Sequence, residues 1–370
     1  MKKTAHNPSM LKEIFAQPNL LKTLIEQPIN FDSLLSNPDV IDLIYIIACG
    51  SSLNSSLVAK SWLESLSNIP TTVISATEIM TKKKLLLSPH TLVIAVSQSG
   101  QTFEVLTALE NNFKNTDLRV NQILGITNHP LEKIANLVDV IIPLNCGEER
   151  AIPATKTYTS NLMIFFQLAL KLAIMRKTLN LAEINQLKQQ LTQIPDLISA
   201  YLPAQLNIVI KLAKILEKEQ NILLLGRDND YGTALEGALK IQETSYTHAQ
   251  GFFTGEFKHG PRALINEQTP IIMITNCEHD PDEITLKDAE LYQKQGGLLI
   301  GVTQETSESK TTFAHILPRG NISPILAPIL NIIPLQILAC HLALIRGLDP
   351  DHPRNLTKAV TQLTIDLKLQ

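Results

Sequence analysis

Short runs of branched apolar residues recur along both halves of the chain. They are IYIIACGSS (44–52), TLVIAVSQSG (91–100) and QILGITN (122–128) in the first half, and NILLLGRDN (221–229), TPIIMITN (269–276) and LLIGVTQ (298–304) in the second. Apolar and polar positions hardly alternate within these runs, which is typical of strands buried on both faces of a parallel sheet. The pattern therefore predicts three such strands in each half.

Segments with helical patterning lie between and after the strands. The shorter ones are 55–66, 103–113, 233–245 and 282–295, and the longer ones are 155–177 and 323–346. Alternation of strand and helix predicts right-handed crossovers and an α/β sandwich.

The two halves are related by an internal repeat. Gly50 and Gly226 are 176 residues apart, and so are Gly125 and Gly301, whereas the middle strands are offset by 178. Nearly constant spacing across three strands indicates two copies of one domain. We expect an N-terminal helical segment (1–38), a first α/β domain (39–180), a helical connector (181–205), a second α/β domain (206–346) and a C-terminal tail (347–370). The first segment is predicted to hold two short helices, with Pro8, Pro18 and Pro28 as punctuation.

Composition excludes several classes of protein. The chain has 370 residues, 44% of them hydrophobic and 18% charged, with a net charge of −3 and no long basic run. This argues against nucleic acid as a partner. The start lacks the apolar stretch of a signal peptide. Residues 321–345 carry no charge, but three prolines interrupt them, so we expect a buried helix rather than a membrane span.

The remaining composition favours a cytoplasmic protein. Its four cysteines, Cys49, Cys146, Cys277 and Cys340, are scattered and form no CxxC pair, which favours reduced thiols in a cytoplasmic protein. The nine histidines show no metal-ligand spacing, and no nucleotide fingerprint is present. We therefore expect no metal and no cofactor.

Two loops of the first half combine hydroxyl side chains, glycine and a following helix. They are ACGSSLNSS (48–56), with Ser51 and Ser52, and SQSGQT (97–102). Hydroxyls and free N–H groups at a helix N-terminus bind anions, and Gly50 and Gly100 allow close approach of the backbone. The same residues also cap helices and form turns, but two such loops on neighbouring strands favour a phosphate site.

The segment 236–261 carries candidates for proton transfer. Glu236, Lys240 and Glu243 are spaced to share one helix face. Such pairs are common on solvated helices. Here, however, a loop rich in glycine and aromatic residues is expected to follow, and then His259 in a His-Gly-Pro context, which is more typical of a cleft wall.

These motifs together resemble the sugar isomerase (SIS) domain, and most nearly the isomerase half of glucosamine-6-phosphate synthase. The resemblance covers nearly the whole chain, through KEIFAQP (12–18), CGSS (49–52), SQSGQT (97–102), IPATK (152–156), EGALKIQETSYTHA (236–249), GEFKHGP (255–261) and DHPRNLTKAVT (351–361). It implies two tandem SIS domains, each a parallel five-stranded sheet flanked by helices.

The resemblance also implies roles for individual residues. The phosphate would be held by Ser52, Ser97, Gln98, Ser99 and Thr102, with Ser51 beside them, and Ala154 would line the sugar. Glu243 would move the proton between C1 and C2, with Lys240 as its support. His259 would assist ring opening in the site of a neighbouring subunit, so a homodimer is expected. Lys358 would contact the sugar or form a Schiff base, and Arg354 would fix the tail. Gln250 stands where the synthase is expected to carry a glutamate.

The predicted reaction is conversion of glucosamine 6-phosphate to fructose 6-phosphate and ammonia. The 38 residues before the first strand are too few for a glutaminase domain, so this chain is not expected to use glutamine by itself. Two alternatives remain open. One is an isomerase module that uses free ammonia or a separate glutaminase, and the other is a non-catalytic sugar-phosphate-binding SIS protein.

Overall fold

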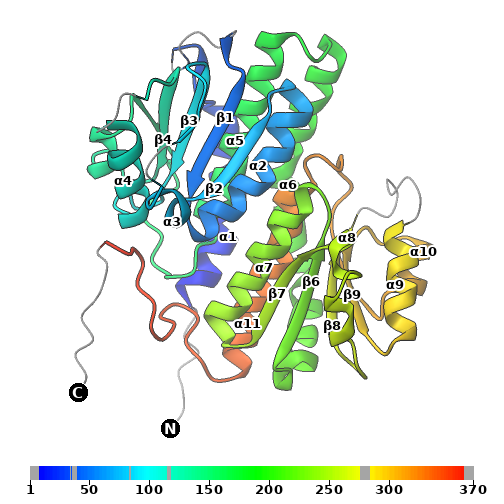
Figure 1. The fold of residues 1–370 in the computed structure, drawn as a ribbon. Coiled ribbons are helices and arrows are strands. Elements are labelled where there is room, and N and C mark those ends of the chain that lie inside the picture. Colours follow the sequence, from blue (N-terminus) through cyan, green and yellow to red (C-terminus); the bar gives the residue numbers. More distant parts are fainter. Residues whose placement is uncertain are drawn as a thin grey trace, which may run out of the picture.

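Two parallel five-stranded sheets form the framework of the protein (Figure 1). The computed structural model describes residues 8–33, 35, 40–82, 85–114, 118–275 and 284–361. The strand order is β2-β1-β3-β4-β5 in the first sheet and β10-β9-β8-β6-β7 in the second. Every pairing is parallel, so the predicted fold class is confirmed.

The strands are short, and the central ones are buried throughout. The first sheet contains β1 (Leu43–Ala48), β2 (Thr71–Ser75), β3 (Thr91–Val96), β4 (Gln122–Thr127) and β5 (Val140–Pro143). The second contains β6 (Asn221–Gly226), β7 (His248–Phe253), β8 (Pro270–Ile274), β9 (Leu298–Thr303) and β10 (His315–Pro318). The six apolar runs in the sequence correspond to the three central strands of each sheet.

Helices fill the space between the sheets and cover their outer faces. They are α1 (Ser9–Glu26), α2 (Gly50–Ser67), α3 (Ala76–Ile79), α4 (Phe103–Leu109), α5 (Lys156–Arg176), α6 (Leu181–Ile215), α7 (Asn229–Ser245), α8 (Thr254–Phe257), α9 (Ile284–Lys294), α10 (Ser307–Thr312) and α11 (Ala327–Ile345). Helices α2 and α5 of the first half contact α7 and α11 of the second, so the two halves share one helical layer (Figure 1).

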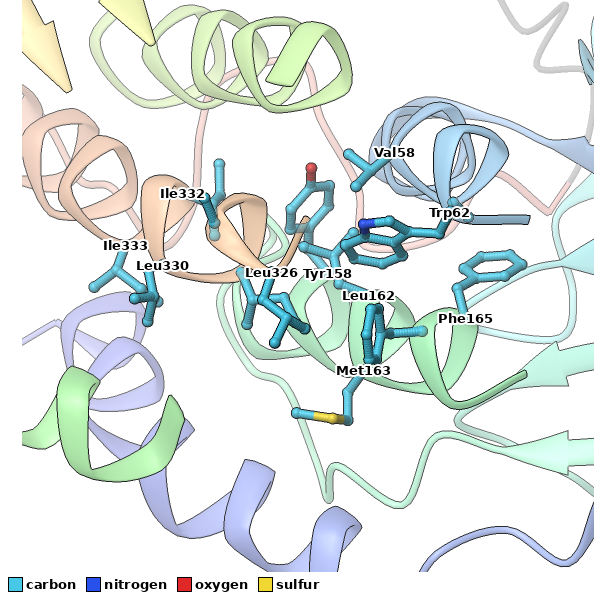
Figure 2. Packing of buried hydrophobic residues seen from close by; sticks show 14 of the residues in the cluster. Val58, Trp62, Tyr158, Leu162, Met163, Phe165, Leu326, Leu330, Ile332 and Ile333 are labelled. Atoms are coloured by element: carbon cyan, nitrogen blue, oxygen red, sulfur yellow. The ribbon is translucent and has the colours of Figure 1, made fainter. Parts of the chain in front are cut away.

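One hydrophobic core runs through this shared layer. Trp62 of α2 packs edge-on against Phe166 of α5, with ring centroids 5.3 Å apart, and its indole N–H donates to the carbonyl of Ile325 across the layer. Figure 2 shows Trp62 and Tyr158 beside residues at the start of α11. Helices α5 and α11 are long and apolar enough to cross a membrane, but both are mostly buried inside the fold, as core helices are.

Two elements differ from what the sequence predicts. Residues 9–26 form one helix rather than two short ones, and Pro18 lies inside it, where packing of the buried residues Ile14 and Leu21 offsets the lost hydrogen bond. The segment HAQGFF after α7 is the edge strand β7, not a loop. The helical segment predicted over 103–113 is present, as α4 followed without a break by a π-helix over Glu110–Lys114.

The internal repeat is present, but the first strands of the two sheets, β1 and β6, do not align as the spacing of Gly50 and Gly226 predicts. The ladder Ile47–Ala95–Gly125 of the first sheet corresponds to the ladder Leu225–Met273–Gly301 of the second. Counting on from these strands, Gly50 corresponds to Asp228 rather than to Gly226. Gly50 and Asp228 both have a positive φ, at 55° and 49°, which supports this correspondence.

Cys49, Cys146 and Cys340 are free thiols, and Cys277 lies outside the described residues.

Candidate active site

A polar cavity of about 250 Å³ lies where the two halves meet. Its walls come from the start of α2, the loop before α4, the loop before α5, one face of α7 and the C-terminal tail. The lining residues are Cys49, Ser51, Ser52, Gln98, Ser99, Thr102, Glu149, Ile152, Ala154, Thr157, Tyr158, Asn161, Lys240, Glu243, Leu356, Thr357, Lys358 and Val360. Most of the residues singled out from the sequence therefore surround one space.

The start of α2 forms one wall. Gly50 begins the helix with a φ of 55°, and Ser51 and Ser52 follow in its first turn. Cys49, at the N-cap position, makes no side-chain cap, so no side chain there satisfies the first N–H groups of the helix. Free N–H groups beside two serine hydroxyls form a site suited to an anion.

The loop SQSGQT forms the adjacent wall at the carboxyl end of β3. Gly100 has a φ of 65°, and a Cβ there would lie 2.8 Å from the Cβ of Glu132, so only glycine fits. The backbone of Gln98 accepts from Asn128 N at 3.0 Å, which fixes the loop against the end of β4. Gln98, Ser99 and Thr102 line the cavity from this loop.

Ser97 has a different position. It is 2% exposed, does not line the cavity, and its hydroxyl is hydrogen-bonded to that of Thr102 at 2.7 Å. In this arrangement Ser97 orients Thr102, which itself faces the cavity.

Helix α7 contributes a cluster of charged residues, which is hydrogen-bonded to Ser51 at the start of α2. Lys240 Nζ donates to Glu243 Oε2 at 2.5 Å and to Ser51 Oγ at 3.2 Å, and lies 3.4 Å from Glu236 Oε1. The Lys240 side chain is fully buried, whereas that of Glu243 is 19% exposed and lines the cavity. Lys240 thus connects Ser51, in the first turn of α2, to the carboxylate of Glu243.

The surroundings of Lys240 keep it charged. Burial disfavours its ammonium form, but the carboxylates of Glu236 and Glu243 outweigh that effect and raise the pKa of Lys240 above its ordinary value. Burial raises the pKa of Glu236, although Lys240 and the Nδ2 group of Asn54, which donates at 2.9 Å, both oppose this shift. The cluster is a fixed positive charge between two carboxylates.

The tail brings a second lysine to the cavity. Lys358 Nζ donates to Glu149 Oε2 at 2.6 Å and to the carbonyl of Ala151 at 2.7 Å. Glu149 is completely buried, and it also accepts from Thr155 N at 3.0 Å and from Thr157 N at 3.1 Å. Burial opposes ionisation of Glu149, but Lys358 and these donors outweigh it and lower the pKa of Glu149.

Arg354 fixes the tail farther back. Its guanidinium lies 4.2 Å from the ring centroid of Tyr246, and its backbone N–H donates to the Tyr246 hydroxyl at 2.9 Å. Tyr246 directly follows α7, so the tail is attached to the helix that carries Glu243. At its far end, Val360 O accepts from Phe103 N at 3.0 Å, next to the SQSGQT loop.

Two residues noted in the sequence lie away from the cavity. His259 is exposed in the turn after α8 and does not line the cavity with Glu243. Gln250 is exposed on β7, outside the cavity wall. The fold of the single chain therefore does not bring His259 to the cavity that Glu243 lines.

Several lining residues were not anticipated from the sequence. Glu149 is the most important, since its carboxylate holds Lys358, yet in the sequence it is only one of three charged residues, Glu148 to Arg150. Tyr158 and Asn161 lie one turn apart in a helix that reads as a core helix. A useful signal was available in IPATK, a turn-forming segment directly before a buried helix.

The cavity has the parts needed for proton transfer on a phosphorylated substrate. Hydroxyls and a helix N-terminus at one wall suit a phosphate group. In the same cavity, Glu243 is a carboxylate with partial access to the space and a lysine partner that fixes its orientation. Among the described residues, no three His, Cys, Asp or Glu side chains form a group that could hold a metal ion.

Comparison with known proteins identifies the class of fold. The SIS domain family matches residues 41–171 and 215–346, which together exceed half of the chain. The protein belongs to the SIS domain family and carries two copies of the domain.

Similar curated proteins are glutamine–fructose-6-phosphate aminotransferases of the isomerizing type. The one from Thermosynechococcus vestitus is 39% identical over 328 residues, and the one from Gloeobacter violaceus is 41% identical over 322 residues. Each match covers 87% of this chain but only 52% of the relative. The chain therefore spans about half the length of these relatives.

Solved structures agree with this assignment. The C-terminal domain of glucosamine-fructose-6-phosphate aminotransferase from Francisella tularensis superposes with a TM-score of 0.87 at 28% identity, covering 95% of this chain and all of that one. Glucosamine-6-phosphate deaminase from Thermotoga maritima superposes with a TM-score of 0.75 at 27% identity, covering 95% of this chain and 99% of that one.

Proposed function

We propose that this protein is a sugar-phosphate isomerase that acts on an amino sugar phosphate. The favoured reaction converts glucosamine 6-phosphate and water to fructose 6-phosphate and ammonia. The observation that carries the proposal is the cavity in which hydroxyl groups suited to phosphate share one space with Glu243 and its lysine partner. The relatives named as isomerizing aminotransferases and as a deaminase add support.

The proposed steps assign one task to each group. Ser51, Ser52, Ser99 and Thr102 bind the phosphate and so fix the other end of the sugar near Glu243. After ring opening, Glu243 takes the proton from C2 while the aldehyde oxygen gains a proton, which gives an enolamine. Glu243 then returns its proton to C1 while the amino group loses one, which gives the 2-imine. Water then adds to the imine carbon and ammonia leaves.

Positive charge assists these steps. Lys240 orients Glu243, and Lys358 contacts the oxygen atom on C1, where negative charge develops as the enolamine forms. We further propose a homodimer in which His259 of one copy assists ring opening in the cavity of the other. This would explain why a histidine in the matching motif is exposed in the single chain.

A second candidate is the opposite direction, in which fructose 6-phosphate and ammonia form glucosamine 6-phosphate. Identities of 39–41% to proteins named as aminotransferases favour it. A role as a non-catalytic sensor of sugar phosphates is less favoured, because binding alone needs neither Glu243 nor its buried lysine partner.

The decisive experiment is incubation of the purified 370-residue chain with glucosamine 6-phosphate, without metal or nucleotide, while ammonia and fructose 6-phosphate are measured together. Equal formation of both products supports the proposed reaction. Fructose 6-phosphate with ammonium chloride tests the second candidate. Tight binding of both sugars with no turnover, and no exchange of the C2 proton with deuterated water, would leave only the sensor.

A further inference from the structure

The first turn of α1 is capped by a side chain from the far end of the sequence. Pro8, at the N-cap position, provides no side-chain cap. Instead, Asp351 Oδ2 accepts from Ser9 N at 2.7 Å and Asp351 Oδ1 accepts from Met10 N at 2.8 Å. The Asp351 carboxylate therefore satisfies two free N–H groups of the helix and is stabilised by the positive end of its dipole.

Asp351 also holds the loop that surrounds Lys358. Its carbonyl oxygen accepts from Ile152 N at 2.9 Å. The carbonyl of Ile152 in turn lies 3.4 Å from Lys358 Nζ, beside the stronger bond from Lys358 to the carbonyl of Ala151. A continuous set of hydrogen bonds thus runs from the start of α1 through Asp351 to the amine in the cavity.

A second residue of α1 supports the same loop. Glu13 is 7% exposed, and its Oε1 accepts from Arg150 N at 2.5 Å. Arg150 directly follows Glu149, the carboxylate that pairs with Lys358. Helix α1 therefore fixes the loop 149–152 at both of its ends, once through Glu13 and once through Asp351.

We infer that Asp351 and Glu13 are positioning residues, which join α1 to the loop 149–152 and the tail so that Lys358 is held at the reacting end of the cavity. Neither side chain lines the cavity, so both act through Lys358 and Glu149. The inference rests on the proposed function, because the amine needs a fixed place only if it contacts a reacting sugar.

The test compares Asp351→Ala, Asp351→Asn and Glu13→Ala with Asp32→Asn. Asp32 is an exposed residue that forms an ion pair with Lys171, away from the loop 149–152 and the tail. Its variant is therefore a matched control. We expect Asp351→Ala to lower kcat for glucosamine 6-phosphate about 10- to 100-fold, since small displacements of catalytic groups have effects of that size. KM should stay close to that of the unaltered chain, because the phosphate loops lie on other elements.

The conservative variant provides the rescue. Asparagine keeps an oxygen that caps a helix, so Asp351→Asn should retain more of the kcat than Asp351→Ala. Glu13→Ala, which removes the acceptor for Arg150 N, should also lower kcat without raising KM. All assays are run well below the thermal midpoint of each variant, so a loss of stability alone does not change kcat.

Hydrogen exchange tests the connection without using activity. Amides of residues 150–152 and 352–360 should exchange faster in Asp351→Ala than in Asp32→Asn. If the unaltered chain has no activity but this exchange difference is present, the proposed function fails and the structural connection stands. If the unaltered chain is active and the Asp351 and Glu13 variants keep the kcat of the control, the positioning role is wrong.

Discussion

The two halves of the protein share a sheet order but use their helix N-termini in opposite ways. In the first half, α2 begins with Ser51 and Ser52, which face the cavity. Counting on from the matched strands, Asp230 of α7 corresponds to Ser52. Asp230 is buried, and Asn331 Nδ2 donates to its Oδ1 at 2.9 Å.

This difference shows how one fold divides the work between its copies. The second half places its own carboxylate at the start of α7, the position where the first half offers hydroxyls and free N–H groups to an external anion. Helix α7 lines the cavity with side chains of its later turns instead, Lys240 and Glu243. Duplication of the sheet thus gives one half that binds and one half that supplies chemistry.

The largest expected effect comes from the chemical half. Glu243→Gln keeps the shape of the side chain but removes the base, so kcat for glucosamine 6-phosphate should fall about 10²- to 10⁴-fold with little change in KM. Steady-state kinetics and exchange of the C2 proton with deuterated water measure this. Glu256→Gln, an exposed glutamate on α8, is the control. A normal rate for Glu243→Gln together with a slow Glu256→Gln would move the base to Glu256.

The binding half is tested at Ser99. A hydrogen bond to a charged group contributes about 1.5–3 kcal/mol, so Ser99→Ala should raise KM about 10- to 100-fold and leave thermal stability unchanged. Ser307→Ala, at an exposed position of α10 in the second half, is the matched control. Equal KM values in the two variants would show that the SQSGQT loop does not bind the phosphate.

Subunit mixing tests whether a third element belongs to the site. Glu243→Gln and His259→Ala should each be inactive as homodimers. If His259 acts across a two-fold axis, half of a randomised mixture is heterodimer with one intact site of two, and about a quarter of the activity should return. Activity is measured after exchange of subunits has been verified by mass spectrometry. Complete exchange without any recovery would assign His259 to its own chain's site or to none.

The smallest effect concerns the stability of the second half. Burial raises the pKa of Asp230 to about 6, although the hydrogen bond from Asn331 opposes this shift. Between about pH 4 and pH 6 the folded state keeps a proton that the unfolded state has released, so the free energy of unfolding should fall as pH rises, by about 3 kcal/mol at most. Asp230→Asn should remove this part of the slope, as measured by urea unfolding at several pH values. If the free energy of unfolding depends on pH in the same way in Asp230→Asn as in the control Asp32→Asn, Asp230 does not titrate in this range.

The sequence predicts the centre of each sheet well and its edges poorly. Strands such as β1 and β3 are buried on both faces, so their unbroken apolar runs are visible in the sequence. An edge strand such as β7 has exposed polar positions, His248 and Gln250, and resembles a loop until its pairing with β6 is seen. Likewise, Pro18 suggested a helix end because proline breaks helices. The packing that keeps it inside α1 involves other elements and cannot be predicted from the local sequence.

The candidate site shows the same division. Ser51, Ser99 and Glu243 lie in motifs with a chemical pattern, and the structure brings them to one cavity. Glu149 was missed because its importance comes from Lys358, more than two hundred residues later in the chain. Contacts between distant segments leave no periodicity or spacing in the sequence, so only the fold reveals them.

The crossing of the tail over the cavity has a consequence for how the protein is made. Figure 1 shows the tail in red, running from the end of α11 past the start of α1 towards α4. Synthesis on the ribosome proceeds from the N-terminus, so both sheets and all their loops emerge before Lys358 does. A nascent chain can therefore fold both halves and form the phosphate loops while its cavity still lacks the amine. The cavity receives this amine only when the tail packs back onto α1, a helix made more than three hundred residues earlier.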